Sequence, residues 1–286
     1  MKPGEPLDRR ALDAHPLPRV IDGDKETKGR LVVIAGSREM PGAALLAATA
    51  AMRAGAGKLR IATGESVAAQ VGTAMPEAMM IALAEKHGEF AASVVGEVAE
   101  QAARADAVVA GPGMPRGEAC GRIAEALLEC DARLALDAAL LHSLEPLPRR
   151  ERATMPVLLP HRRELAALLD RGEAEIERDP IASGIRAAEL YRSVVLVKGV
   201  DSHVVTPAGD TWTYTGGAPG LGVSGSGDVL AGIVGGLLAR GAEPLNALLW
   251  GVWLHGQAGV RLARKVGPIG FLAREIADEV PALLPR

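Results

Sequence analysis

The stretch between Gly216 and Gly241 constrains this chain more than any other. It reads GGAPGLGVSGSGDVLAGIVGGLLARG and passes from a glycine-rich loop into an apolar run without a break. From Val229 onward, apolar residues recur at helical spacing, and the small residues between them allow close packing. Gly241 stands where a helix C-cap glycine is expected. The stretch therefore predicts a flexible loop that leads directly into a buried helix.

A glycine-rich loop before a helix is a typical anion site, because the first N–H groups of a helix lack partners and the helix dipole is positive there. We expect Gly225, Ser226 and Gly227 to form such an anion hole for a phosphate or a transferred phosphoryl group. Asp228 then has two interpretations: an N-cap of the helix, or a general base that takes a proton from a substrate hydroxyl. Spacing alone leaves both open. No Lys-Ser or Lys-Thr pair follows the glycines, so this is not a Walker A loop.

Length and composition favour one large α/β domain. The chain has 286 residues, is 48% hydrophobic and only 2% aromatic, which suits small-residue helices packed on a sheet. Its net charge of −3 predicts no nucleic-acid partner. No apolar run reaches the roughly 18 residues that a membrane span needs, and the first ten residues lack a signal-peptide core. We therefore expect no membrane partner and a cytoplasmic location.

The two cysteines and the remaining acids predict no dedicated metal site. Cys120 and Cys130 have neither zinc-ligand spacing nor the pattern of a disulfide framework, so we interpret both as structural. Any metal ion would then depend on a ligand that the protein binds.

Strands alternate with helices along most of the chain, which indicates a mostly parallel sheet covered by helices on both faces. We interpret residues 1–27 as an N-terminal extension without a core of its own and residues 28–286 as a single domain. The expected strands lie at residues 31–35, 58–63, 78–83, 105–110, 134–137, 155–159 and 193–199, followed by a hairpin at 203–217. The expected helices lie at residues 42–54, 90–104, 117–130, 164–169, 244–266 and 269–284, with a short helix or loop at 70–75.

Polar residues follow several of these strands. In open α/β sheets, ligands bind beyond the carboxyl ends of the strands, so residues there are candidates for a site. They are Gly36 with Ser37, Gly111 to Gly113, Asp137, His161, and Lys198 with Gly199.

The segment GSGDVLAG closely resembles the G-[ST]-G-D-x-L-x-G signature of the ribokinase-like superfamily. Further segments, in register over roughly residues 28 to 284, resemble one branch of it, the ADP- or ATP-dependent NAD(P)H-hydrate dehydratases. These segments are MPEAMM, AGPGM, LALDAALL, LLPHRRELAALL, VVLVKGVDSHVVTPAG and GVWLHGQAG. The resemblance implies a ribokinase-like three-layer sandwich.

The resemblance also implies roles for individual residues. Asp228 is implied as the catalytic base over the Gly225–Gly227 anion hole. The implied nucleotide-binding residues are Lys198, Gly199, Val200, Asp201, Ser202 and Gly227, and the implied substrate-binding residues are Ala43, Ala44, Gly113, His161 and Asp228.

For several of these residues a plainer interpretation stands beside the implied one. His161 could be a structural hydrogen-bonding residue, Gly113 a simple turn, and Ala43 with Ala44 a packing surface. Asp137 could contact substrate or a magnesium-bound water. For His255 we expect a capping or packing role rather than ligand binding.

The implied activity is nucleotide-dependent dehydration of NADHX and NADPHX to NADH and NADPH, by phosphorylation of the ring hydroxyl and loss of phosphate. The implied co-substrate is ADP or ATP with Mg²⁺, and the implied assembly is a homo-oligomer such as a tetramer. Ala139, Arg162, Ala218 and Val260 stand where the family usually carries other residues. Two alternatives therefore stay open: another small-molecule kinase, of the hydroxymethylpyrimidine or thiazole type, and a nucleotide-binding protein that has lost catalysis.

Overall fold

The computed structural model describes residues 4–19, 28–146 and 152–285. A ten-stranded sheet forms its middle layer, in the order β1-β12-β11-β10-β9-β8-β7-β2-β3-β4. Neighbouring strands run parallel except at the β10–β11 and β11–β12 pairs, which confirms the predicted parallel sheet and hairpin. The strands are β1 (Glu5–Pro6), β2 (Arg30–Ile34), β3 (Lys58–Gly64), β4 (Ala78–Leu83), β7 (Ala107–Ala110), β8 (Arg133–Leu136), β9 (Val157–Leu158), β10 (Val194–Val197), β11 (Ser202–Val205) and β12 (Thr211–Tyr214).

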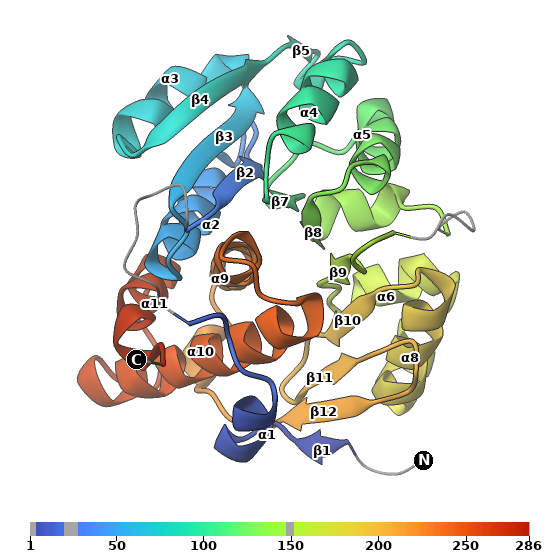
Figure 1. The fold of residues 1–286 in the computed structure, drawn as a ribbon, viewed down its shortest axis with the longest axis vertical. Coiled ribbons are helices and arrows are strands. Elements are labelled where there is room, and N and C mark those ends of the chain that lie inside the picture. The colour runs from blue at the N-terminus through green and yellow to red at the C-terminus, as the bar shows by residue number, and fades with distance from the viewer. Residues whose placement is uncertain (1–3, 20–27, 147–151, 286) are drawn as a thin grey trace.

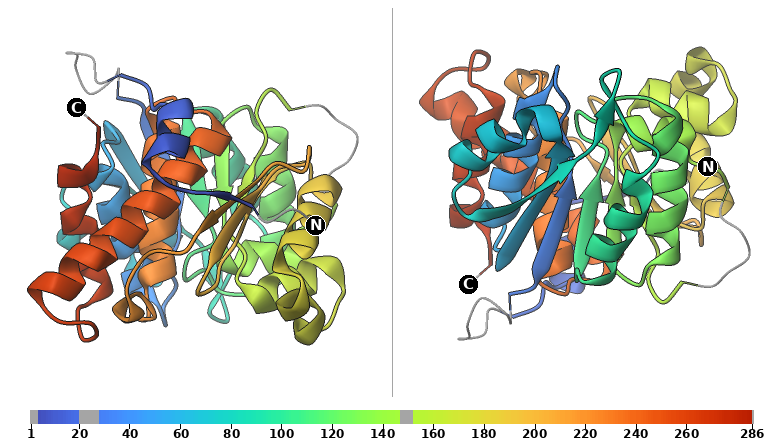
Figure 2. Two further views of the ribbon diagram at one scale, coloured as in Figure 1. Left: turned by 90° about the horizontal axis from the view of Figure 1, so that it is seen from below. Right: turned by 90° about the horizontal axis from the view of Figure 1, so that it is seen from above.

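Helices cover both faces of this sheet, so the predicted three-layer sandwich is confirmed (Figure 2). One face carries α1 (Arg9–Ala14), α2 (Pro41–Arg53), α3 (Glu65–Ala74), α9 (Ser226–Ala239), α10 (Pro244–Lys265) and α11 (Ala273–Glu279). The other carries α4 (Val94–Ala103), α5 (Glu118–Glu129), α6 (Arg162–Leu169), α7 (Glu173–Arg178) and α8 (Pro180–Leu190). Side chains alternate along each strand, so Leu31 and Val33 join the first core while Val32 and Ile34 join the second.

Helix α9 lies near the middle of the first layer, against α2 (Figure 1). Its small residues explain the close approach: a Cβ at Gly232 would collide with the Ala47 carbonyl, and a Cβ at Gly236 with the Ala51 carbonyl. The helix ends as expected, with Gly241 in the left-handed region at φ 90°. Within the described ranges, no helix combines the length and apolarity that a membrane crossing requires.

Several elements differ from the sequence predictions, and α7 and α8 were not predicted. Helix α3 begins at Glu65, five residues before the short helix or loop that we expected at Gln70. Residues 90–93 precede α4 instead of starting it, because Phe90 belongs to a small hairpin of β5 (Glu85–Lys86) and β6 (Glu89–Phe90). Helix α11 covers only Ala273–Glu279, because Gly270 adopts φ 97° before it and Pro281 follows it.

The N-terminal segment adds to the sheet and to the first core. Strand β1 pairs in parallel with β12, and Leu7 and Leu12 are buried. The Trp250 indole Nε1–H donates to the His15 carbonyl at 2.8 Å. Residues 20–27 of the predicted extension lie outside the described residues. The division into an extension and a domain remains a prediction, but Leu7, Leu12 and Leu17 of this segment are buried in the core of the larger part.

Candidate active site

The carboxyl ends of β8, β9 and β10 bring three predicted polar residues to one rim. Asp137 follows β8, His161 follows β9 and Lys198 follows β10. His161 and Lys198 form an isolated parallel bridge, and the Lys198 N–H donates to the Pro160 carbonyl at 3.1 Å. Convergence of strand ends at this edge is the arrangement that the parallel sheet predicted.

Lys198 and Asp137 form a close ion pair beside the predicted anion hole. The Lys198 Nζ lies 2.6 Å from Asp137 Oδ1, and the Ala138 N–H donates to the same oxygen at 2.9 Å. A Cβ built on Gly227 would lie 3.7 Å from the Lys198 Nζ. The ammonium therefore stands next to the N-terminus of α9, where it adds positive charge for a phosphoryl group.

Asp228 lies in the first turn of α9, partly buried next to this pair. Burial raises the pKa of Asp228 most, the Asp137 carboxylate also raises it, and the Lys198 ammonium lowers it, so that the resulting pKa is about 6. Gly225 is the N-cap of α9, with φ 87°, and no side chain of the described residues caps this end. Asp228 is thus not an N-cap, and a carboxylate with a raised pKa beside an anion hole suits a general base.

His255 on α10 contacts the first turn of α9. The His255 Nε2 lies 2.9 Å from the Ser226 hydroxyl and 3.1 Å from the Ser226 carbonyl oxygen. Burial lowers the pKa of His255 to about 4, so the ring is neutral at pH 7. The Ser226 N–H donates to the Val223 carbonyl at 3.2 Å. Since Ser226 already has these protein partners, the expected anion hole depends mainly on Gly225 and Gly227. The packing role expected for His255 agrees with these contacts.

His161 is the N-cap of α6. Its Nδ1 accepts from the N–H groups of Arg163 at 3.1 Å and Glu164 at 3.3 Å, and the Glu164 carboxylate accepts from the His161 N–H at 2.8 Å. His161 therefore has the structural hydrogen-bonding role that was one of its two interpretations. Because Nδ1 accepts, the ring proton lies on Nε2, and 52% of the side chain is exposed. A substrate contact through the exposed ring remains a prediction.

The first turn of α2 and the loop after β7 touch each other. Gly113 adopts φ 60°, and a Cβ there would collide with the Ala43 side chain. Ala44 is fully buried, and a Cβ on Gly36 would lie 3.1 Å from its methyl group. The side chains of Ala43 and Ala44 thus pack inside the protein, so any substrate contact of these two residues would use their backbone.

The predicted nucleotide segment is the turn between β10 and β11. Gly199, Val200 and Asp201 are exposed, with Val200 at 99%, and the Ser202 hydroxyl donates to the Gly199 carbonyl at 3.5 Å. The turn therefore presents its backbone to solvent next to Lys198, and its role in nucleotide binding remains a prediction.

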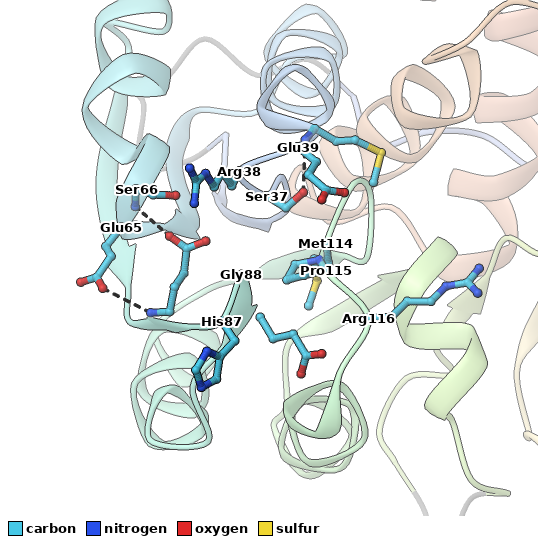
Figure 3. A pocket seen from close by; sticks show the side chains of 13 residues that line it. Ser37, Arg38, Glu39, Glu65, Ser66, His87, Gly88, Met114, Pro115 and Arg116 are labelled. Carbon is cyan, nitrogen blue, oxygen red and sulfur yellow. Dashed lines mark hydrogen bonds between the residues drawn. The ribbon is translucent and has the colours of Figure 1, made fainter.

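A cavity of about 930 Å³ opens beyond the carboxyl ends of β2, β3, β4 and β7 (Figure 3). Met40, the N-cap of the helix α2 that carries Ala43, and Met114, which follows Gly113, contribute to its lining. Of its lining residues, the sequence analysis singled out only Ser37. The start of α3 and the β5–β6 hairpin form much of its wall, and both are too short to give a periodic pattern.

The three-layer sandwich, with a glycine-rich loop and a carboxylate at the start of α9, places this chain in the ribokinase-like class of proteins. The fold matches a solved ribokinase-like superfamily protein of Enterococcus faecalis, with a TM-score of 0.82, 25% identity, and coverage of 98% of this chain and 94% of that one. A family model described as NAD(P)H-hydrate dehydratase matches residues 31–282. The chain belongs to the NAD(P)H-hydrate dehydratase family.

Individual relatives agree with this assignment. An ADP-dependent (S)-NAD(P)H-hydrate dehydratase of Xanthomonas campestris is 46% identical, over 96% of this chain and 94% of that one. The structure of ADP/ATP-dependent NAD(P)H-hydrate dehydratase from Bacillus subtilis, co-crystallised with ATP/Mg²⁺, superposes with a TM-score of 0.84 at 28% identity. It covers 98% of this chain and 97% of that one.

Proposed function

We propose that this protein repairs hydrated nicotinamide nucleotides, converting NADHX and NADPHX to NADH and NADPH at the expense of ADP or ATP. Family membership supports the reaction class, and one observation supports it in this chain: the Asp228 carboxylate, with a pKa raised to about 6, stands beside Gly227 and the Lys198 ammonium. A base, an anion hole and a cation at one point are the groups that phosphoryl transfer to a hydroxyl requires.

Asp228 accepts the proton of the hydroxyl group on the hydrated ring. The hydroxyl oxygen then bonds to the γ-phosphorus of ATP or the β-phosphorus of ADP, and the bond to the leaving nucleotide breaks. The backbone at Gly225 and Gly227 and the Lys198 ammonium stabilise the charge on the transferred group. In the second stage the C–O bond breaks and phosphate leaves with the bonding electrons, a proton passes from the adjacent ring carbon to water, and the ring double bond re-forms.

Magnesium and the nucleotide fit the residues present. The described residues contain no group of three or more side chains that could hold a metal ion, so the nucleotide phosphates and water would supply most ligands of Mg²⁺. Asp228 and Asp137 are the carboxylates at the anion hole that could complete the set. When bound, the ion neutralises phosphate charge.

The remaining assignments follow the family resemblance. We propose that Lys198, Gly199, Val200, Asp201, Ser202 and Gly227 bind the nucleotide and that Ala43, Ala44, Gly113 and His161 bind the hydrate. We also expect a cytoplasmic homo-oligomer, such as a tetramer, which light scattering of the purified protein would test.

Asp228→Asn tests the reaction and the base together. The wild type should restore the near-ultraviolet absorbance of reduced nicotinamide from either hydrate when ADP or ATP and Mg²⁺ are present. The variant should keep its fold and nucleotide affinity but lose about 10²–10⁴-fold in turnover, the range for a lost general base. A stable phosphorylated alcohol without restored absorbance would instead indicate a small-molecule kinase. Nucleotide binding without any turnover in the wild type would indicate a binding protein.

A further inference from the structure

The cavity beyond β2, β3, β4 and β7 carries more negative than positive side chains. Its lining contains four carboxylates and two guanidinium groups: Glu39, Glu65, Glu85 and Glu89 against Arg38 and Arg116. Among the residues that the structure describes, none of these four carboxylates forms an ion pair. Ion pairs within the described part of the chain therefore do not compensate these four carboxylates.

The two guanidinium groups do not contribute equally. The Arg116 Nη2 lies 2.9 Å from the His142 Nε2, and Figure 3 shows Arg116 extending away from Glu65 and Ser66. Arg38 extends toward Ser66, and no ion pair of Arg38 occurs among the described residues. Arg38 is thus the one cation of the lining that faces the carboxylate side.

Two of the carboxylates are held in place by backbone N–H groups. The Ser66 N–H donates to Glu85 Oε2 at 2.8 Å, and the Glu85 N–H donates to Glu65 Oε1 at 3.4 Å. The other oxygen of Glu85 is buried and has no hydrogen-bond partner in the described part of the chain. A Cβ on Gly64 would lie 2.6 Å from this oxygen, so the carboxylate must rotate to reach the cavity. Because a buried acceptor without a partner is costly, a ligand that donates a hydrogen bond favours this rotation.

The cavity lies next to the predicted substrate side of the catalytic site. Met40 and Met114 line it, and Gly113, next to Met114, packs against Ala43 in the first turn of α2. One turn further along α2, Leu46 packs against Gly225 of the anion hole. The first turn of α2 therefore separates Asp228 from the cavity, and a dinucleotide with its hydrated ring at Asp228 can extend past α2 into the cavity.

We propose that this cavity takes the adenosine ribose of the hydrated dinucleotide, and that Glu65 and Glu85 make the enzyme prefer NADHX to NADPHX. This inference rests on the proposed function. A ribose 2′-hydroxyl can donate to a carboxylate, as it does in NAD-specific sites of another fold. A 2′-phosphate adds about −1.5 to −2 charges and only acceptor atoms, so the same carboxylates repel it.

Calorimetric titration with each hydrate, without nucleotide, measures the preference apart from catalysis. We expect the wild type to bind NADHX at least about tenfold more tightly than NADPHX, since close like charges repel by a kcal/mol or more. The double variant Glu65→Gln/Glu85→Gln keeps oxygen acceptors for the backbone N–H groups and should reduce this ratio about tenfold. Glu77→Gln is the matched control, because Glu77 is exposed before β4 and outside the cavity.

Arg38→Gln provides a second test that does not depend on the double variant folding, because Arg38 lies exposed in a loop. It removes the cation that faces the carboxylates and should widen the preference for NADHX. Equal affinity for the two hydrates, tighter binding of NADPHX, or a ratio unchanged in both variants would overturn the inference, as would failure to bind either hydrate. If the wild type binds with the expected preference but converts neither hydrate, the proposed function fails and the cavity assignment stands.

Discussion

At the scale of single residues, the charges of Asp137, Lys198 and Asp228 are coupled at the rim. Lys198 forms an ion pair with Asp137, and the pKa of Asp228 is raised to about 6 by burial and then by Asp137, against the effect of Lys198. A general base acts only when deprotonated, so kcat/KM should fall as the pH falls through about 6.

Asp137→Asn should move this acidic limb of the pH–rate profile, the range in which kcat/KM falls with falling pH, to lower pH. The substitution removes a carboxylate that raises the pKa of Asp228 and leaves the Lys198 ammonium, which lowers it. A pH–rate profile of each protein measures the limb, with Asp131→Asn, at an exposed position before β8, as the control. A limb that stays in place or moves to higher pH in Asp137→Asn would contradict the assignment of the limb to Asp228.

Lys198 and His161 are neighbours in the bridge between strand ends, but their side chains serve different contacts. Lys198 lies next to Gly227, so Lys198→Ala should lower the affinity for ADP or ATP. The ring of His161 lies half exposed at the N-cap of α6. His161→Ala should therefore lower the affinity for the hydrate and leave the affinity for the nucleotide nearly unchanged. Titration of each ligand alone separates the effects.

Loss of the α6 cap needs its own control, because it costs about 1 kcal/mol of stability. Asparagine is a good N-cap, so His161→Asn should restore stability but not hydrate affinity. If both alanine variants weaken the same single ligand, the model of two adjoining pockets is wrong.

At the scale of elements, close contact of α9 with α2 sets the position of the anion hole. A Cβ at Gly232 would collide with the Ala47 carbonyl, which is backbone and cannot rotate away. Gly232→Ala should therefore destabilise the fold by about 1–3 kcal/mol, the usual cost of overpacking.

Gly96 on α4 is the matched control, because a Cβ there would meet nothing within 4 Å. Gly96→Ala should stabilise the protein by about 0.5–1 kcal/mol through higher helix propensity. Denaturant unfolding of both variants measures the difference. An unchanged or higher stability of Gly232→Ala would show that the two helices can separate without cost.

The same two elements show why much of the fold could be predicted. The apolar run from Val229 and strands such as Val194–Val197 are buried on all sides, so their sequences are continuously apolar. The signature around Asp228 also predicted the start of α9, where Asp228 lies in the first turn; its role as the base stays a prediction. Helix α3 starts with Glu65 and Ser66, which are exposed and polar, and the β5–β6 hairpin has strands of two residues. Neither element shows a periodic pattern of apolar residues, so the cavity that they line could not be predicted.

The Asp137–Lys198 pair was beyond sequence reasoning for another reason. Its members are 61 residues apart and meet only because β9 lies between β8 and β10 with all three strands parallel. The order of strands in a sheet is a property of the folded chain. Polar endings on several strands predicted a shared rim, but not which two side chains would pair across it.

At the scale of the whole molecule, α10 connects the N-terminal segment to the catalytic end. Trp250 contacts the His15 carbonyl, and His255, little more than one turn further along the helix, contacts Ser226 at the start of α9. Strand β1 forms one edge of the sheet beside β12. The segment that we expected to be an extension without a core thus contacts α10, the same helix that contacts the start of α9.

Leu12→Ala tests whether this segment folds with the rest. Leu12 is fully buried in the first core, so the substitution should cost about 2–5 kcal/mol and shift one cooperative unfolding transition to lower denaturant concentration. Ile269→Ala, at a position that is 69% exposed, should change stability by no more than about 0.5 kcal/mol. If residues 1–27 were independent of the domain, Leu12→Ala would leave the main transition in place. A shifted transition with unchanged slope would instead show that the edge strand, α10 and the anion hole unfold together.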